Sequence, residues 1–262
     1  MSRFELLDWY DTPRYYDLVF DEDTGREADF LEAASARYGR PRGRRVLEPA
    51  CGSGRLVVEM ARRGWDVTGF DLSEPMLDYA AQRLARRGLQ ARLEVGRLEA
   101  MDHGPRFDLA HCLVSTFKYV RDEAGARAHL EGVARALRPG GIYVLGFHLS
   151  EYDNPSRVRE RWVVERGRTK VVCNIQSWPP DRRRRAERVR SRLVVSERGR
   201  EKRSETEWTF RTYDASQVRR LFRSVPALEL VAVHDMVYDI DWTRELDDTQ
   251  LDCVFVLRRK RD

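Results

Sequence analysis

The segment 46–56, Val46-Leu-Glu-Pro-Ala-Cys-Gly-Ser-Gly-Arg-Leu56, indicates the fold class of this 262-residue chain. It predicts an apolar strand that runs into a glycine-rich turn and then into a helix. Gly52 and Gly54 permit backbone angles and a close approach that a side chain would block. In an open parallel sheet, the first turn of this kind lies outside the carboxyl ends of the strands, where ligands bind.

Strands and helices alternate on both sides of this turn. The predicted strands are Arg45–Ala50, Trp65–Phe70, Ala91–Val95, Phe107–Val114, Ile142–Leu149, Leu228–Val237 and Leu251–Leu257, and the predicted helices are Arg26–Tyr38, Gly54–Arg63, Glu74–Arg87, Asp122–Arg138 and Asp214–Phe222. Most of the strands are almost continuously apolar, which is typical of a sheet with both faces covered. We therefore predict an α/β fold with a doubly wound, seven-stranded, mostly parallel sheet.

The residues around the turn also indicate what it binds. Asp71 ends the next strand, where a carboxylate can accept both hydroxyl groups of a ribose. The third glycine of a dinucleotide-binding turn is missing, because position 57 is Val57. Glu48 precedes the turn, and a carboxylate there suits a ligand with a cationic centre better than it suits phosphates.

Three motifs in this order, ExxCGSG, GFDLSEPML and RPGG before a strand, resemble the class I S-adenosylmethionine (SAM)-dependent methyltransferases from about Val46 to Leu149. The resemblance implies SAM as the cofactor, with its methionine part held by Glu48, Ala50, Cys51, Gly52, Ser53 and Gly54. It implies that Asp71 binds the ribose and that Leu72, Met76, Arg97, Leu98 and Glu99 surround the adenine. Leu113 is expected to face the transferring methyl group.

One position departs from a common pattern of this family, which has Asp after the glycine of the adenine segment. This chain has Arg97 there. The usual contact with the adenine amino group is therefore open, and Glu99 or Asp102 can replace it.

The catalytic residues are not identified by the sequence. Tyr16 and His148 are candidates, because an aromatic face attracts a sulfonium and an imidazole can act as a base. Phe117, Lys118, Tyr119 and His148 are candidates for contacting the substrate, since they follow the fourth and fifth strands. Surface packing of Tyr16, a helical first turn at Phe117–Tyr119 and a structural role for His148 are the alternatives.

After Ser150 the apolar residues alternate with arginines, which predicts two or three antiparallel strands with one solvent-exposed face. Residues 151–211 contain 18 Lys/Arg and 10 Asp/Glu, whereas the whole chain has a net charge of +5. The architecture resembles small-molecule N-methyltransferases, in which such an insert roofs the site or forms a subunit interface. The predicted acceptor is therefore an amine of a small molecule, and a homodimer is an open expectation.

Two alternatives remain at this stage. One is an RNA or protein methyltransferase, and the other is a non-catalytic SAM-binding protein that uses the arginine-rich insert to bind nucleic acid. Methylation of DNA adenine is disfavoured, because residues 113–119 lack the Asn/Asp-Pro-Pro-aromatic motif.

We expect four segments in the chain: an N-terminal helical cap (1–44), a SAM-binding core (45–150), a β insert (151–212) and a C-terminal helix with two strands (213–262). Neither a secretory signal nor an apolar run long enough for a bilayer is recognisable, which predicts a cytoplasmic protein without membrane contact. The four cysteines, Cys51, Cys112, Cys173 and Cys253, are expected to be buried thiols, and no metal site is predicted.

Overall fold

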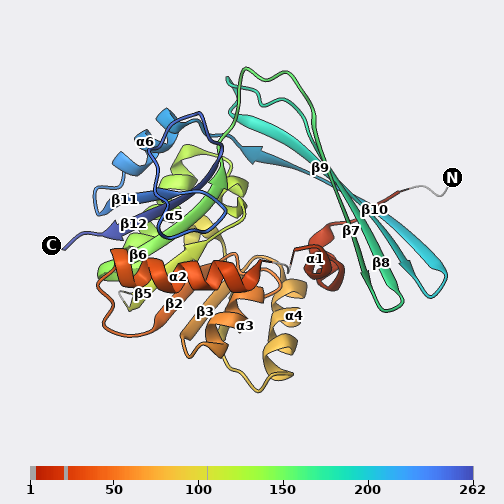
Figure 1. The fold of residues 1–262 in the computed structure, drawn as a ribbon, viewed down its shortest axis with the longest axis horizontal. Helices are drawn as coiled ribbons and strands as arrows, with labels where there is room; N and C mark the ends of the chain where they lie inside the picture. Colours follow the sequence, from red (N-terminus) through yellow and green to blue (C-terminus); the bar gives the residue numbers. More distant parts are fainter. Residues whose placement is uncertain (1–3, 21–22, 105, 262) are drawn as a thin grey trace.

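The computed structural model describes residues 4–20, 23–104 and 106–261, which form two sheets (Figure 1). The larger sheet has seven strands in the order β11-β12-β6-β5-β2-β3-β4. These are β2 (Arg45–Pro49), β3 (Asp66–Asp71), β4 (Arg92–Val95), β5 (Phe107–Cys112), β6 (Leu137–His148), β11 (Leu228–His234) and β12 (Asp252–Arg259). Only β12 runs antiparallel to its two neighbours. The predicted doubly wound, seven-stranded, mostly parallel sheet is confirmed.

Helices cover both faces of this sheet, because side chains alternate along each buried strand. The helices are α2 (Thr24–Tyr38), α3 (Arg55–Arg62), α4 (Glu74–Ala85), α5 (Glu123–Ala136) and α6 (Ala215–Arg223). Val46 packs with α2, α3 and α4, whereas its neighbour Leu47 packs with α5 and α6. Val144 and Leu145 of β6 divide between the two faces in the same way. The near-continuous apolar strands therefore lie in the centre of a three-layer core.

The helix predicted to extend to Arg138 ends earlier, and the Arg-Pro-Gly-Gly motif lies at the start of β6. Helix α5 ends at Ala136, and Leu137 already pairs with Phe107 of β5. The ladder shifts register between Phe107 and Leu109. A Cβ atom at Gly141 would lie 3.1 Å from the carbonyl oxygens of Phe107 and Asp108. The glycine thus permits a close approach of two backbones inside the sheet.

The insert forms a second sheet of five strands in the order β1-β10-β9-β8-β7. It contains β7 (Val158–Arg166), β8 (Thr169–Ser177), β9 (Ala186–Glu197) and β10 (Arg200–Arg211), which are antiparallel, and β1 (Glu5–Leu6), which is parallel to β10. The insert therefore has four strands where two or three were expected. Strand β7 was missed, because its charged residues are exposed on both faces and leave little alternation to detect.

One face of the second sheet is apolar and packs on the N-terminal segment. Val171, Cys173, Leu193 and Val195 contact the short helix η1 (Trp9–Asp11) and helix α1 (Pro13–Phe20). Figure 1 shows α1 between the core helices and the insert strands. The expected cap, residues 1–44, therefore divides: residues 4–20 pack on the insert, whereas α2 packs on the core sheet.

The opposite face of the insert carries arginines in pairs with glutamates. Arg188 lies 2.6 Å from Glu207, and Arg192 lies 2.5 Å from Glu205. The turn before β9 contains the arginine run 182–185, as expected. Among the described residues, no helix is long and apolar enough to span a membrane.

Candidate active site

A cavity of about 770 Å³ opens where the carboxyl ends of β2, β3 and β5 meet the N-terminal segment. A second cavity of about 310 Å³ adjoins it beside the glycine turn. Tyr16, Ala50, Gly52 and Thr116 line both, so the two cavities adjoin each other and are together called the channel. The cavities lie outside the carboxyl ends of the strands, where the ligand site is predicted.

The glycine turn has the left-handed backbone that its sequence requires. Gly52 and Gly54 have φ angles of 52° and 71°. A Cβ atom at Gly52 would meet nothing within 4 Å, whereas one at Gly54 would lie 2.5 Å from the Cβ of Ala80. Gly52 therefore leaves room on the cavity side, and Gly54 allows helix α3 to approach α4. Cys51 is buried under the turn, and burial raises the pKa of its thiol well above the usual value, which favours the protonated, unreactive form.

The carboxylate of Asp71 is fixed at the mouth of the turn. Its Oδ2 accepts a hydrogen bond from the amide of Gly52 at 2.8 Å, and its Oδ1 accepts one from the amide of Ser73 at 2.9 Å. Ser73, and not Asp71, is the N-cap of α4. Asp71 lines the cavity with lone pairs left for ribose hydroxyl groups.

Glu48 provides a test of whether the channel fits a cationic ligand. Its side chain is buried, it lines the second cavity, and its Oε2 has no hydrogen-bond partner among the described residues. Burial raises the pKa of this carboxyl to about 8. The ring of His111 lies 4.0 Å away, and burial lowers its pKa to about 3, which keeps it neutral. A buried carboxyl with one oxygen unpaired among the described residues fits the ammonium group of a methionine moiety.

The predicted adenine residues divide into two groups. Leu72, Arg97, Leu98 and Glu99 line the larger cavity, as does Phe70 at the end of β3. Arg97 donates to Glu99 at 2.8 Å, so the residue that departs from the family pattern is held by its neighbour. Met76 is fully buried and is not among the lining residues described, where Pro75 lies instead.

The far end of the larger cavity has an aromatic wall. Tyr16 and Tyr119, both predicted, lie there with Tyr10 and Trp208. Tyr10 donates a hydrogen bond to the hydroxyl oxygen of Tyr119 at 2.8 Å, and burial raises the pKa of Tyr16 to about 12. Asp8 and Asp11 add two carboxyl groups to this wall. Their positions in an aromatic and acidic N-terminal stretch are visible in the sequence, but only tertiary packing brings them to the cavity.

Three other candidates lie behind this wall. Phe117 belongs to the hydrophobic core, and Lys118 is fully buried. Nδ1 of His148 lies 2.8 Å from Oγ of Ser115, and its Nε2 contacts Nζ of Lys118. Both ring nitrogens are therefore occupied by protein groups, and none of the three residues is among those described as lining the channel. Glu187 of the insert, which the sequence reasoning missed, completes this cluster at 3.3 Å from Lys118.

The remaining predicted residues lie at the methionine end of the channel. Ala50, Cys51, Ser53 and Leu113 line the second cavity together with Glu48 and Gly52. Gly54 is not described as lining it, because it faces Ala80. All the residues predicted for the methionine part or the methyl group, except Gly54, thus reach the channel.

Comparison with known proteins agrees with this geometry. A family model described as a methyltransferase domain matches residues 46–141. The ubiquinone biosynthesis O-methyltransferase of Alkalilimnicola ehrlichii is 37% identical over 114 residues, which are 42% of this chain and 44% of that protein. The chain spans about half the length of the curated relatives that it matches first.

Two solved structures share the fold along nearly the whole chain. A SAM-dependent methyltransferase from Clostridium acetobutylicum gives a TM-score of 0.77 at 18% identity, covering 97% of this chain and 99% of its own. The sugar N-methyltransferase KedS8 from Streptoalloteichus gives a TM-score of 0.76 at 20% identity, covering 100% of this chain and 96% of its own.

The fold is that of the class I SAM-dependent methyltransferases. Residues 46–141 form the methyltransferase domain of this chain, and SAM is the cofactor of that domain. The predicted class, fold and cofactor are therefore confirmed.

Proposed function

We propose that the protein transfers the methyl group of SAM to an amine nitrogen of a small molecule. One observation carries this proposal: two adjoining cavities place the Glu48 and Asp71 carboxyl groups and the aromatic and acidic wall in one channel. SAM, when bound, supplies a methyl group activated on a sulfonium sulfur. Asp71 holds the ribose, and Glu48 accepts the ammonium group at the opposite end of the channel.

The wall of the acceptor end aligns the nucleophile and limits the access of water. Tyr16 lies on both cavities, so its ring borders the junction where the methyl group passes. The rings of Tyr10, Tyr119 and Trp208 offer faces that attract positive charge, which moves from sulfur to nitrogen during transfer. Each such contact stabilises a cation by about 0.5–2 kcal/mol.

Nitrogen is favoured over oxygen as the acceptor atom. A neutral amine attacks without a base, whereas a hydroxyl group needs deprotonation. No imidazole, thiol or lysine is found among the described residues that line the larger cavity. The carboxyl groups of Asp8 and Asp11 attract a cationic amine and can accept the proton that it must lose before it attacks. The likeness to KedS8 agrees with this choice, whereas the ubiquinone relative makes O-methylation the second candidate.

A nucleic-acid acceptor has less support. The insert arginines Arg188 and Arg192 are paired with glutamates, and Trp208 faces the cavity instead of solvent. Paired arginines present little net charge to a phosphate backbone. Binding of RNA that is tight and falls steeply with salt would favour this alternative.

Calorimetric titration of the purified protein with SAM, S-adenosylhomocysteine and NAD tests the cofactor site. We expect micromolar binding of the first two ligands alone. Asp71→Asn should weaken it by about 10- to 100-fold, since each lost hydrogen bond to a hydroxyl costs about 1–2 kcal/mol. Asp78→Asn, an exposed change on the helix that follows Asp71, serves as the control and should bind normally.

A panel of small amines and phenols, assayed for transfer of labelled methyl from SAM, then tests the acceptor. Methylation of amines alone supports the proposal. Methylation of phenols alone would replace it with O-methylation. If neither S-adenosylhomocysteine nor SAM binds to folded protein, the proposed function is wrong.

A further inference from the structure

Residues 115–123, here called the wall segment, include residues that line the acceptor end of the larger cavity. The segment runs from the end of β5 to the start of α5 and contains the helical turn η3 (Thr116–Tyr119). Thr116 and Tyr119 line the cavity, whereas the side chain of Lys118, between them, is fully buried on the other side. The contacts of Lys118 therefore fix the turn from behind.

These contacts join the core to the insert. Nζ of Lys118 lies 3.3 Å from Oε2 of Glu187 on β9 and 5.1 Å from the ring centroid of Phe210 on β10. It also contacts Nε2 of His148 at the end of β6. Oε2 of Glu187 lies 3.5 Å from the same ring nitrogen. One carboxylate from the insert thus holds two side chains of the core.

The charge state of this cluster depends on Glu187. Burial lowers the pKa of Lys118 to about 8, although the charges of Glu187 and Asp252 raise it. Burial alone would raise the pKa of Glu187, but the hydrogen bond from His148 and the charge of Lys118 bring it to about 2. Burial and the charge of Lys118 also lower the pKa of His148. A buried ammonium without its carboxylate is strongly unfavourable.

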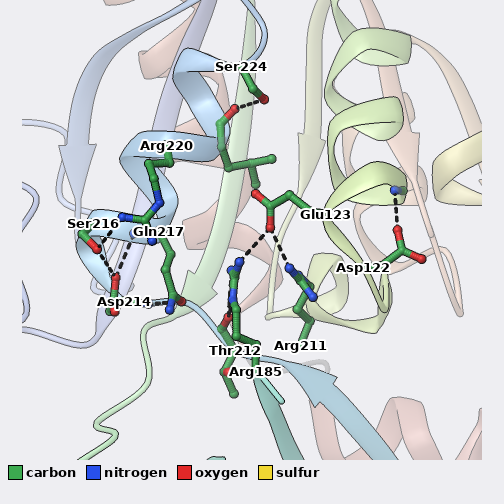
Figure 2. A network of polar contacts seen from close by, with 12 residues as sticks. Asp122, Glu123, Arg185, Arg211, Thr212, Asp214, Ser216, Gln217, Arg220 and Ser224 are labelled. Atoms are coloured by element: carbon green, nitrogen blue, oxygen red, sulfur yellow. Dashed lines mark hydrogen bonds and ion pairs between the residues drawn. The ribbon is translucent and has the colours of Figure 1, made fainter. Parts of the chain in front are cut away.

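A second tie holds the other end of the wall segment (Figure 2). Glu123, the first residue of α5, accepts hydrogen bonds from Arg185 at 2.7 Å and from Arg211 at 2.6 Å. These arginines flank the start of β9 and the end of β10. Arg211 also donates to the carbonyl oxygen of Arg121 at 3.1 Å. The wall segment is therefore fastened to the root of the insert at both ends.

We infer that Glu187 is a positioning residue for the acceptor site, which acts through Lys118 to hold the turn that presents Thr116 and Tyr119. The inference rests on the proposed function, because it gives the insert a role in placing the acceptor. It assigns no contact between Glu187 and the cofactor, and none of the channel-lining residues described is Glu187.

A double-mutant cycle tests this role. Glu187→Gln and Lys118→Met should each lower kcat/KM for the best amine of the panel by about tenfold, since small misplacements of reacting groups are costly. The double variant should be no worse than either single one, because both remove the same tie. The dissociation constant of S-adenosylhomocysteine should stay within about twofold in all three. Glu205→Gln, on the outer face of the insert, is the matched control and should have normal kinetics.

The pH profile separates positioning from simple loss of structure. Lys118 is protonated below about pH 8 in the wild type, so kcat/KM should fall above that pH. Removing Glu187 lowers the pKa of Lys118 further, and the basic limb should move to lower pH. An unchanged limb in Glu187→Gln, or the same shift in Glu205→Gln, would overturn the inference.

Hydrogen exchange gives a readout that needs no acceptor. The amides of Lys118 and Val120 donate to the carbonyl oxygens of Ser115 and Phe117 within the turn. Glu187→Gln should increase exchange in peptides covering residues 116–121, whereas Glu205→Gln should not. Unchanged exchange overturns the inference even if the panel contains no substrate; absence of turnover in the wild type concerns the proposed function alone.

Discussion

Glu48 illustrates, at the scale of one residue, how burial prepares a site for a charged ligand. The carboxyl lies at the methionine end of the channel, and one of its oxygens is unpaired among the described residues. The ring of His111, 4.0 Å away, stays neutral because burial lowers its pKa to about 3. Burial raises the pKa of Glu48, whereas the charge of Arg55 lowers it. With a pKa of about 8, Glu48 is mostly protonated in the free protein at pH 7.

Binding of a ligand ammonium should therefore release a proton from Glu48. We expect titration with S-adenosylhomocysteine at pH 7 to release roughly 0.5–1 proton, detected as a dependence of the binding enthalpy on the ionisation enthalpy of the buffer. Affinity should rise between pH 6 and pH 8, because ionisation of Glu48 becomes less costly. Glu48→Gln should abolish the release, and buffer-independent enthalpy in the wild type would refute the prediction.

Gly54 and Gly88 both have a positive φ, but only Gly54 is crowded by a neighbouring residue. Substitution of each by alanine therefore distinguishes the cost of backbone strain from the cost of a steric clash. Gly88 has φ of 63° and open space within 4 Å of the position that a Cβ atom would take, so Gly88→Ala should cost about 1 kcal/mol of unfolding free energy. Gly54→Ala adds a collision with Ala80 and should cost about 3 kcal/mol. Denaturant unfolding measures both. Equal losses would show that the contact between α3 and α4 relaxes freely.

The residues that the sequence predicted well are those fixed by short-range geometry. Gly52 lies in the turn after β2, and Asp71 lies at the end of the neighbouring strand β3. A hydrogen bond joins the two residues. The side chain of Met76 is fully buried and is not among the residues described as lining the cavity, which its position in the sequence does not reveal. Glu187 carries no local signal, since only the packing of the insert against β6 brings it to Lys118 and His148.

At the scale of elements, the N-terminal segment connects the cofactor channel to the insert. Trp9 is 5% exposed, and its ring centroid lies 5.2 Å from that of Tyr16 and 4.8 Å from that of Trp208. Both partners line the channel. Helices and strands of the core were predictable from their periodicity, whereas β1, with two residues paired to β10, is too short to leave a pattern.

Removal of the Trp9 ring should loosen the packing of the N-terminal segment over the channel. We expect Trp9→Ala to lower the free energy of unfolding by about 3–5 kcal/mol, because a large buried ring is lost. The affinity for S-adenosylhomocysteine should fall as well, since Tyr16 loses its support. Trp242→Ala, at a ring that is 54% exposed, should change stability by no more than about 0.5 kcal/mol. Similar effects of the two changes would contradict a role of Trp9 in holding the N-terminal segment over the channel.

At the scale of the whole molecule, the core and the insert meet at the Glu123 clamp, the pairs of Glu123 with Arg185 and Arg211 in Figure 2. Arg185 and Arg211 both stack on Tyr213, with their guanidinium carbons 4.8 and 5.8 Å from its ring centroid. Within the arginine run, Arg185 thus has a structural role, because it joins the turn to Glu123 and Tyr213 of the core. Composition revealed the basic insert, but only the fold distinguishes Arg185 from its exposed neighbours.

Glu123→Gln should weaken the attachment of the insert while leaving the core sheet intact. We expect faster hydrogen exchange at the ends of β9 and β10 next to the core, with β2 and β3 unchanged. Glu131→Gln, on the same helix and paired with Arg127, provides the control. Equal exchange in the two variants would show that the clamp does not hold the insert.

The pairing of the N-terminal segment with β10 also affects the order in which the protein can be completed during synthesis. The amide of Trp9 donates to Oγ1 of Thr206, 197 residues later in the chain. A ribosome that adds about 5–20 residues per second needs roughly 10–40 s to make that partner. The glycine turn and Asp71 emerge long before then, so the nascent chain holds an uncovered cofactor site until β10 is translated. We therefore expect the channel to be covered only after the insert is synthesised. A ribosome that stalls within the insert should leave the channel open.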